Sequence, residues 1–329
     1  MNQANLLSLS KRPGITALLI ALVAWFGVTA VATRPTTPDG ARAVRLKQNP
    51  IIHPRLGAIG DNINGPSLIR APKWLPKPLG RYYLYFADHN GKYIRLAYAD
   101  KIEGPWSIHE PGALKLDETI CDGHIASPDV HIDEAKRGLR MYFHGPIKAV
   151  NRQVTLVATS KDGVHFTPSK EILGDSYFRV FQWNGHYYAM ARLGALFRSR
   201  DGLTNFERGG NPFESGSRRS MARHVALKLD GDVLSVFYSN IGDAPESILM
   251  SRIELKKDWK DWVASEPVMI LKPETGYEGA DLPDAPSKEG AAPGRVRQLR
   301  DPAIFREGGK TYLLYSVAGE SGIAIAEIN

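Results

Sequence analysis

The sequence predicts an all-β fold, a five-bladed β-propeller, and three observations support that prediction. From residue 81 onward a unit of short strands recurs five times, with a period of roughly 40–50 residues that is typical of propeller blades. No stretch after residue 45 keeps a helical apolar period, so helices should be few. The 31 glycines and 22 prolines are spread without a period, which favours many turns. A β-sandwich is the alternative, but a sandwich does not require the same strand order in every unit.

The most regular part of each unit is an aromatic-rich strand followed by a strand of small and β-branched residues. The aromatic-rich strands are expected at 82–86, 140–143, 187–191, 233–238 and 311–315, and the strands that follow them at 94–99, 154–159, 195–199, 248–252 and 323–326. A shorter strand near a proline or an arginine precedes each pair, at 66–69, 128–131, 178–181, 223–226 and 302–305. Three units end in a fourth strand that carries tryptophan or phenylalanine, at 104–106, 162–166 and 201–206. Five such units predict five blades.

The N-terminal segment has the parts of a secretory signal peptide. The basic pair Lys11-Arg12 precedes an apolar run that begins at Ile15 and ends in Ala30-Val31-Ala32, which is the order found in such peptides. Residues 1–32 are therefore predicted to be a signal peptide, and an uncleaved membrane anchor is the alternative because the apolar run is nearly long enough to span a bilayer. Both interpretations predict a secreted or periplasmic domain, held at the membrane in the second case.

The rest of the chain divides into a predicted spacer, residues 33–48, and a predicted propeller domain, residues 49–329. The whole sequence has 42 Lys and Arg against 35 Asp and Glu. This excess suits an anionic partner such as an acidic polysaccharide, but solubility explains it equally well. No basic run alternates with aromatic residues, so nucleic acid is not predicted as a partner. The single cysteine, Cys121, excludes an internal disulfide and a Cys-rich zinc site.

Three short motifs resemble those of a known enzyme group. Pro128-Asp129-Val130-His131 opens a strand, Gly104-Pro105-Trp106 ends the first unit, and Arg300-Asp301-Pro302 opens the last one. Over roughly residues 55–329 the chain resembles the five-bladed propeller superfamily of glycoside hydrolase family 43 and its relatives in families 32, 68 and 117. The resemblance implies an active site in the funnel at the centre of one face, where carboxylates act as base, acid and a third orienting group. Glycoside hydrolysis needs such groups because one protonates the leaving oxygen while another activates water or attacks.

The position before the opening proline of a unit is where the resemblance implies the base. The residues in that position are Gly65, Ser127 and Asp301. Gly65 therefore stands where family 43 keeps its basic aspartate, and Asp61 and Asn64 are the nearest polar substitutes. The sequence thus departs from the family pattern at this point.

The carboxylates that remain lead to three predicted catalytic residues. Asp129 matches the aspartate that tunes the others in family 43, and Asp301 resembles the aspartate of the Arg-Asp-Pro motif of families 32 and 68, with a turn-starting role as the alternative. The third unit has no glutamate at 176–179, where the family keeps its acid. Glu278, in the long segment 271–298, replaces that acid if the segment folds inward, and an exposed loop glutamate is the alternative.

Histidines and arginines near the innermost strands are the predicted substrate-binding residues, together with Asn64. The histidines predicted to bind substrate are His89, His131, His144 and His224, and His124 lies near the same strands. Histidine acts as acid or base near neutral pH or binds metal. The arginines are Arg179, Arg223 and Arg300, whose guanidinium forks bind carboxylate, sulfate or phosphate. If the arginines converge, the substrate is anionic, and salt bridges to Asp129 or Asp301 are the alternative. Possible sugar-stacking or blade-packing aromatics are Trp74, Tyr93, Trp183 and Tyr277.

These features predict an exported glycoside hydrolase that releases a terminal sugar from a polysaccharide or oligosaccharide. A polysaccharide lyase acting on a uronate-containing glycan, with a His or Tyr base, is the second hypothesis. A non-catalytic carbohydrate-binding propeller is the third. No cofactor is required by this chemistry, although the resemblance allows a structural calcium ion in the central channel. The sequence predicts no particular oligomeric state, since a closed propeller has no long exposed edge.

Overall fold

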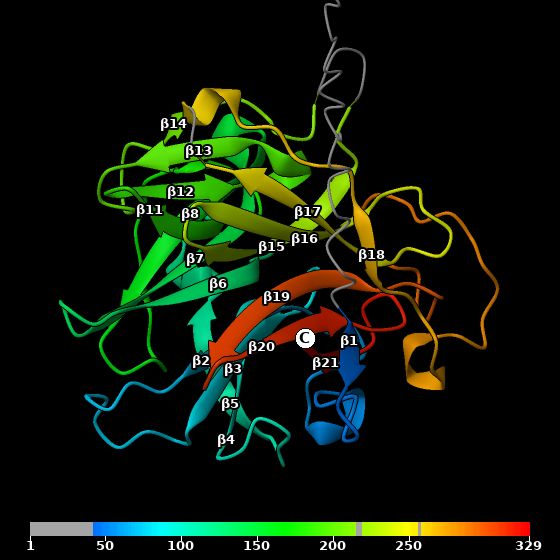
Figure 1. Cartoon of the computed structure of the whole chain (residues 1–329). Helices are drawn as coiled ribbons and strands as arrows, with labels where there is room; N and C mark the ends of the chain where they lie inside the picture. Colours follow the sequence, from blue (N-terminus) through cyan, green and yellow to red (C-terminus); the bar gives the residue numbers. More distant parts are fainter. Residues whose placement is uncertain (1–41, 215–218, 256–257) are drawn as a thin grey trace, which may run out of the picture. The chain divides into compact units, whose positions relative to one another are not determined.

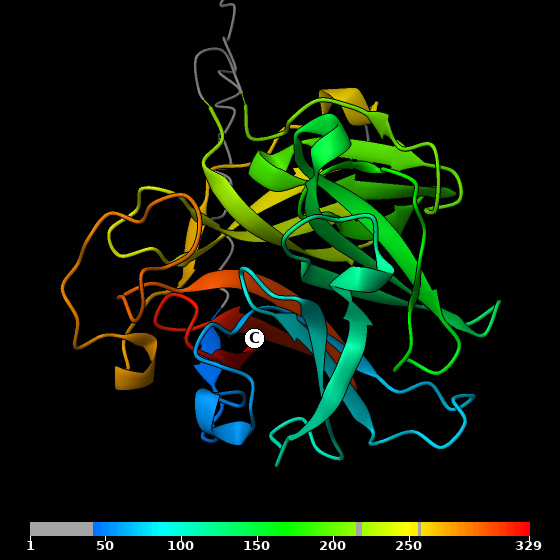
Figure 2. The same cartoon turned by 180° about the vertical axis from the view of Figure 1, so that it is seen from behind.

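The computed structural model describes residues 42–214, 219–255 and 258–329. These residues form five antiparallel sheets arranged as a five-bladed β-propeller, which confirms the predicted fold class (Figures 1 and 2). The predicted signal peptide or anchor, residues 1–32, lies outside the described residues. In the part of the chain that the structure describes, no helix has the length and apolar character needed to cross a membrane.

In blades one to four the strands follow one another along the chain, and the first strand of each blade is innermost. Blade one contains β2 (Asn64–Arg70), β3 (Tyr82–Ala87), β4 (Tyr93–Ala99) and β5 (Ser107–Lys115). Blade two contains β6 (Ala126–Asp133), β7 (Gly138–Ile147), β8 (Arg152–Ser160), β9 (Thr167–Pro168) and β10 (Gly174–Asp175), the last two both pairing with β8. Blade three contains β11 (Arg179–Trp183), β12 (His186–Met190), β13 (Leu196–Ser199) and β14 (Glu207–Arg208).

The last two blades complete the ring. Blade four contains β15 (Ala222–Asp230), β16 (Val233–Asn240), β17 (Ile248–Glu254) and β18 (Val268–Leu271). Blade five contains β19 (Arg300–Glu307), β20 (Lys310–Ser316), β21 (Ile323–Ile328) and β1 (Ala43–Arg45). Short 3-10 helices lie between strands: η1 (Pro54–Leu56), η2 (Leu116–Glu118), η3 (Lys148–Val150), η4 (Arg192–Gly194), η5 (Trp259–Asp261) and η6 (Gly276–Glu278).

The ring is closed by the N-terminal strand. β1 pairs antiparallel with β21, with Ala43 opposite Ile328 and Arg45 opposite Ala326 (Figure 1, the blue strand beside the red one). The predicted boundary was therefore wrong: residues 43–45 belong to blade five and not to a spacer over 33–48. So short a segment shows no strand pattern of its own, because the partner strand from the far end of the chain decides its conformation.

Five apolar clusters fill the spaces between neighbouring blades. The aromatic-rich second strands supply their largest members, and Tyr85, Tyr142, Phe237 and Tyr315 are each at most 1% exposed. Burying a side chain of this size stabilises a fold by about 1.5–3 kcal/mol. The recurring aromatic strands seen in the sequence therefore reflect the packing of one blade on the next.

The fourth strands begin later than predicted. Residues 162–166 and 201–206 form turns before β9 and β14, and residues 104–106 lie in the bend before β5. The reason is the aspartate in the first two segments: Asp162 and Asp201 accept hydrogen bonds from backbone N–H groups of their own turns, at 2.9 and 2.8 Å. Such local bonds compete with strand pairing.

Candidate active site

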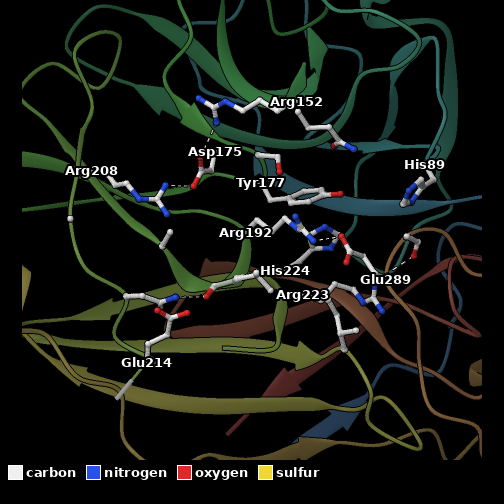
Figure 3. Close-up of a pocket in the computed structure, with 18 of the residues that line it drawn as sticks. His89, Arg152, Asp175, Tyr177, Arg192, Arg208, Glu214, Arg223, His224 and Glu289 are labelled. Carbon is white, nitrogen blue, oxygen red and sulfur yellow. Dashed lines mark hydrogen bonds and ion pairs between the residues drawn. The ribbon is translucent and has the colours of Figure 1, made fainter. Parts of the chain in front are cut away.

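A cavity of about 630 Å³ lies on the propeller axis, since all five blades contribute to its lining (Figure 3). Much of that lining comes from the connections between the second and third strands of the blades. Those connections place His89, Arg192, Ile241 and Glu320 at the cavity, and Arg152 joins them from the start of β8. A cavity of this size is in the range that proteins use for small ligands.

Three inner strands share a bulge near their start. The register shifts by the same step between Asn64 and Ser67, between Ala126 and Asp129, and between Arg300 and Ala303. The residue before the proline has a positive φ in each case: Gly65 (60°), Ser127 (50°) and Asp301 (47°). The equivalence predicted from the three prolines is thus present in the backbone. A left-handed conformation at a residue other than glycine costs free energy, so Ser127 and Asp301 are held there by their surroundings.

His224 and Asp301 form a buried pair beside the cavity. His224 Nδ1 hydrogen-bonds to Asp301 Oδ1, and Ser316 Oγ donates to the other oxygen of Asp301 at 3.0 Å. His224 lines the cavity, whereas Asp301 is 1% exposed and lies behind it. Burial, together with the positive charges of Arg223 and Arg179, holds the pKa of His224 well below its usual range. The imidazole is therefore neutral at pH 7, and with Nδ1–H directed to Asp301 its Nε2 carries a lone pair.

Tyr177 is held between two imidazole rings. Its ring centroid lies 4.1 Å from that of His224 and 4.0 Å from that of His144, edge-on to both. Its φ is 68°, which is rare for an aromatic residue. Burial raises the pKa of Tyr177 to about 12, so the hydroxyl keeps its proton at neutral pH. Figure 3 shows the tyrosine in the middle of the cavity.

The rings continue as a row from His224 toward blade one. His144 lies 6.2 Å from His124, and His124 lies 6.5 Å from His89, measured between ring centroids. Burial lowers the pKa of His124 and, further, that of His144, whose Nδ1 is buried without a hydrogen-bond partner in the described part of the chain. Four of the five histidines near the predicted inner strands thus come together, with Tyr177 inserted between His144 and His224.

Glu320 is the most buried carboxylate that lines the cavity, at 5% exposure. Arg300 donates to Oε1 at 3.0 Å, Asn62 donates to Oε2 at 2.7 Å, and His89 Nδ1 lies 3.5 Å from Oε1. Burial acts to raise the pKa of Glu320, but His89, Asn62 and Arg300 outweigh it and lower the pKa. The group is therefore a carboxylate at neutral pH. Asn64, predicted to bind substrate, donates to Asn62 at 2.9 Å and supports Glu320 from outside the cavity.

Two of the predicted arginines hold the long segment between blades four and five against the cavity. Arg223 forms a two-pronged pair with buried Glu246, at 2.8 and 3.2 Å, and donates to the carbonyl of Lys288 at 2.5 Å. Arg300 donates to the carbonyl of Gly290 at 3.1 Å and to Glu320. We call residues 288–290 the strap. At the cavity mouth Arg192 pairs with Glu289 of the strap (Figure 3).

The three predicted arginines have partners within the protein and do not form an open anion site. Arg179 is buried, and it donates to the carbonyls of Ser127 and Pro128 at 3.3 and 2.8 Å, which supports the bulge of β6. On the opposite rim Asp175 pairs with both Arg152, at 2.9 Å, and Arg208. Each guanidinium at the cavity thus has a carboxylate or carbonyl partner.

Asp129 and His131 form a pair elsewhere. His131 Nε2 lies 2.8 Å from Asp129 Oδ2, and the same oxygen accepts the backbone N–H of Val180 from blade three at 2.9 Å. Burial acts to raise the pKa of Asp129, but His131, Arg179 and Val180 N–H together lower it. Neither Asp129 nor His131 lines the cavity. The structure places Asp129 as a link between blades two and three and not at the predicted catalytic position.

Glu278 is also away from the cavity, so the expectation that it supplies an acid was wrong. The long segment does fold inward, but Glu278 is 0% exposed and pairs with Arg45 of β1, at 2.8 and 3.0 Å. Tyr315 donates to it at 2.9 Å. The carboxylate caps η6 and ties β1 to blade five.

The resemblance allows a structural calcium ion in the central channel. In residues 42–214, 219–255 and 258–329, no three His, Cys, Asp or Glu side chains lie close enough to hold a metal. Calcium takes six to eight oxygen ligands, whereas the axis presents imidazole and phenol rings. Calcium in the channel stays a prediction from the resemblance.

The fold defines the chain as a five-bladed propeller of the kind found in glycoside hydrolase family 43. A family 43 β-xylosidase/α-arabinofuranosidase from a compost microbial metagenome, solved with xylotriose, superposes with a TM-score of 0.61 at 13% identity, covering 87% of this chain and 94% of that one. A family GH130 protein superposes with a TM-score of 0.62 at 13% identity, covering 87% and 93%. Its family is one of mannoside phosphorylases and contains glycoside hydrolases that target β-1,2 mannosidic linkages in Candida mannan. At these identities the likeness is one of fold.

One relative is much closer in sequence. A protein of Acanthamoeba polyphaga mimivirus, described as uncharacterised, is 40% identical over 319 residues, which cover 87% of this chain and 90% of the viral protein. The chain belongs to the same family as this viral protein. No protein-family model matches the sequence.

Sequence reasoning missed Tyr177, Glu320 and Asn62. Tyr177 falls in the third unit at 176–179, where the resemblance implies a glutamate, and no role was predicted for its phenol. Glu320 lies in the connection between β20 and β21, equivalent to the connection that carries His89 in blade one. The available signal was therefore positional: polar residues between the second and third strands of each unit.

Proposed function

We propose that this protein is a glycoside hydrolase that removes a terminal sugar from an oligosaccharide or polysaccharide. The observation that carries the proposal is that one axial cavity presents a neutral imidazole backed by a buried aspartate, His224 with Asp301, and an ionised carboxylate, Glu320. The shared fold of the family 43 and GH130 proteins supports it. The strap narrows one side of the cavity, which favours the end of a glycan over its interior.

The proposed chemistry assigns a role to each group. The C–O bond of the linkage breaks through an oxocarbenium-like transition state, whose positive charge the Glu320 carboxylate stabilises. His224 Nε2 takes a proton from water, and the water oxygen bonds to the anomeric carbon. Tyr177 gives its hydroxyl proton to the leaving oxygen and regains one from the His224 imidazolium, whose ring is its neighbour. Asp301 keeps His224 in the required tautomer and stabilises the imidazolium.

A polysaccharide lyase is the second candidate, and the contact between Tyr177 and His224 favours it. A lyase would use these groups as acid and base and would need arginines to neutralise a uronate. The arginines that line the cavity are already paired: Arg152 and Arg208 with Asp175, Arg192 with Glu289, and Arg223 with Glu246. This pairing supports the hydrolase and a substrate whose terminal sugar is uncharged. The predicted signal peptide supports activity outside the cytoplasm.

Cleavage in water labelled with oxygen-18 tests the proposal. The protein is incubated with a panel of neutral and acidic glycans, and the products are analysed by mass spectrometry. We expect a monosaccharide product with one heavy oxygen, absent with the Asp301→Asn variant. Asp258→Asn is the matched control, because it lies away from the cavity at the N-cap of η5, where asparagine caps equally well. Unsaturated products without label would establish the lyase, and no product across the panel would favour a carbohydrate-binding propeller.

A further inference from the structure

A second cavity, of about 690 Å³, adjoins the axial one. It is lined by residues between 50 and 62, by Tyr277, by residues of 292–295 and by the turn 317–321. Glu320 lines both cavities. The two cavities therefore meet at the carboxylate to which the proposed function gives a catalytic role.

The lining of the second cavity combines apolar faces with hydrogen-bonding groups. The apolar part consists of Pro50, Pro54, Tyr277, Ala292 and Val317, and the polar part includes His53, Arg55, Asn62, Arg295 and Ser321. The Nδ1 atom of His53 is buried and has no hydrogen-bond partner in the described part of the chain. A sugar ring offers C–H faces that pack on aromatic and apolar surfaces, and hydroxyls that satisfy such polar atoms.

Charged groups also line the second cavity. They are Arg55, Arg295, Asp61 and Glu320; Arg295 donates to the carbonyl of Gly276 at 2.7 Å, and Glu320 is paired with Arg300 at 3.0 Å. The preference for uncharged units comes from the adjoining axial cavity, whose arginines are already paired.

Asn62 links the two cavities through its hydrogen bonds. It lines the second cavity, donates to Glu320 at 2.7 Å and accepts the backbone N–H of His89 at 2.8 Å. A ligand in the second cavity therefore touches a residue that positions both Glu320 and His89 in the first.

We propose that the second cavity binds the uncharged sugar units that follow the terminal one, with a ring packed on Tyr277. This inference rests on the proposed function and makes the substrate a neutral chain of several units that spans both cavities at Glu320. A glycosyl fluoride, which carries only the terminal sugar and a one-atom leaving group, occupies the axial cavity alone.

The test compares substrates of different length. The Ala292→Trp variant fills the second cavity, and Tyr277→Ala removes the packing face; exposed Val263→Trp is the control for adding a tryptophan. We expect Ala292→Trp and Tyr277→Ala to lower kcat/KM on neutral tri- to pentasaccharides about tenfold and to leave kcat/KM on the glycosyl fluoride within twofold. Equal losses on both substrates, or no loss in Ala292→Trp on the long ones, would overturn the inference.

Binding separates this inference from the proposed function. Calorimetric titration of the Asp301→Asn protein with the same oligosaccharides should give an affinity that rises with length and falls in the Asp301→Asn/Ala292→Trp double variant. If no glycan is cleaved but the affinity still rises with length, the proposed hydrolase activity is wrong, whereas the assignment of sugar binding to the second cavity is supported. Affinity independent of length overturns the second cavity even if cleavage is found.

Discussion

His224 and Asp301 lie near the starts of the neighbouring inner strands β15 and β19. A hydrogen bond between Nδ1 of His224 and Oδ1 of Asp301 joins them at the edge of the axial cavity. They are 77 residues apart in the chain. The bulge of β19, where Asp301 has a φ of 47°, turns the carboxylate toward the histidine. The pair gives the cavity an oriented base in a site where the other buried charges are already paired.

Removing the charge of Asp301 should impair catalysis far more than binding. In Asp301→Asn the side chain no longer accepts the Nδ1 proton as a carboxylate, so His224 loses both its tautomer and its stabilised cation. We expect kcat to fall by about 10²–10⁴, the range of general acid–base catalysis, with KM changed less than threefold in steady-state kinetics. A drop below fivefold, with normal folding by circular dichroism, would remove the pair from the mechanism.

The phenol of Tyr177 is expected to act through its hydroxyl. Tyr177→Phe keeps the ring between His144 and His224 but removes the proton donor. We expect kcat to fall about 100-fold on substrates with poor leaving groups, and much less on aryl glycosides whose leaving group needs no protonation. The same loss on both substrate types would show that the tyrosine positions the substrate and does not protonate it.

Three partly or fully buried histidines of the row should make the fold sensitive to mild acid. Burial lowers the pKa values of His124, His144 and His224 below the ordinary value of about 6.5. The unfolded chain therefore binds more protons below that pH, and the free energy of unfolding should be constant between about pH 7 and pH 8 and decrease from pH 6.5 to pH 5. Glu320 and Asp129, whose pKa values are also lowered, contribute only below about pH 4.5.

Urea unfolding at several pH values measures this dependence. His144→Phe, which keeps an aromatic ring at the centre of the row, should reduce the slope between pH 6.5 and pH 5. An unchanged slope would place the acid sensitivity elsewhere in the molecule.

The strap should control access to the cavity and add little to stability. Glu289 is 68% exposed and Arg192 38% exposed in their side chains, and exposed ion pairs contribute about 0–1 kcal/mol. Glu289→Gln should leave Tm within about 2 °C and raise KM severalfold, because the cavity mouth is held less firmly. Unchanged KM, with a lower Tm, would make the ion pair a structural one.

Glu278 should matter for folding and not for catalysis. Glu278→Gln leaves Arg45 partly buried beside a neutral amide, and breaking a buried pair costs about 3–5 kcal/mol. We expect a clear fall in Tm by calorimetry, with kcat of the folded protein within twofold of wild type. A large loss of kcat in a fully folded variant would show that Glu278 takes part in catalysis.

The blades could be predicted from the sequence because every blade packs against the next one in the same way. Every second strand needs aromatic residues such as Tyr85 and Tyr142 to fill the space against the next blade, and this need leaves a periodic pattern. β1 could not be predicted, since Ala43–Arg45 is a strand only by pairing with β21 at the other end of the chain.

The site was partly predictable for a different reason. The proline alignment identified Asp301 correctly as part of a backbone feature shared with Gly65 and Ser127, and the histidines were found because their residue type is rare. Asp129 and Glu278 were predicted to be catalytic because the sequence does not show which group a carboxylate pairs with in the folded protein. Their partners, Val180 N–H and Arg45, come from other blades and from the chain terminus.

The most direct test of the central claim is a crystal structure of the Asp301→Asn protein soaked with an oligosaccharide that the wild-type protein cleaves. The account predicts the terminal sugar in the axial cavity, with its linkage oxygen within hydrogen-bonding distance of Tyr177 and its ring between His224 and Glu320. A glycan bound only on another face of the propeller, with the axial cavity free of sugar, would contradict it.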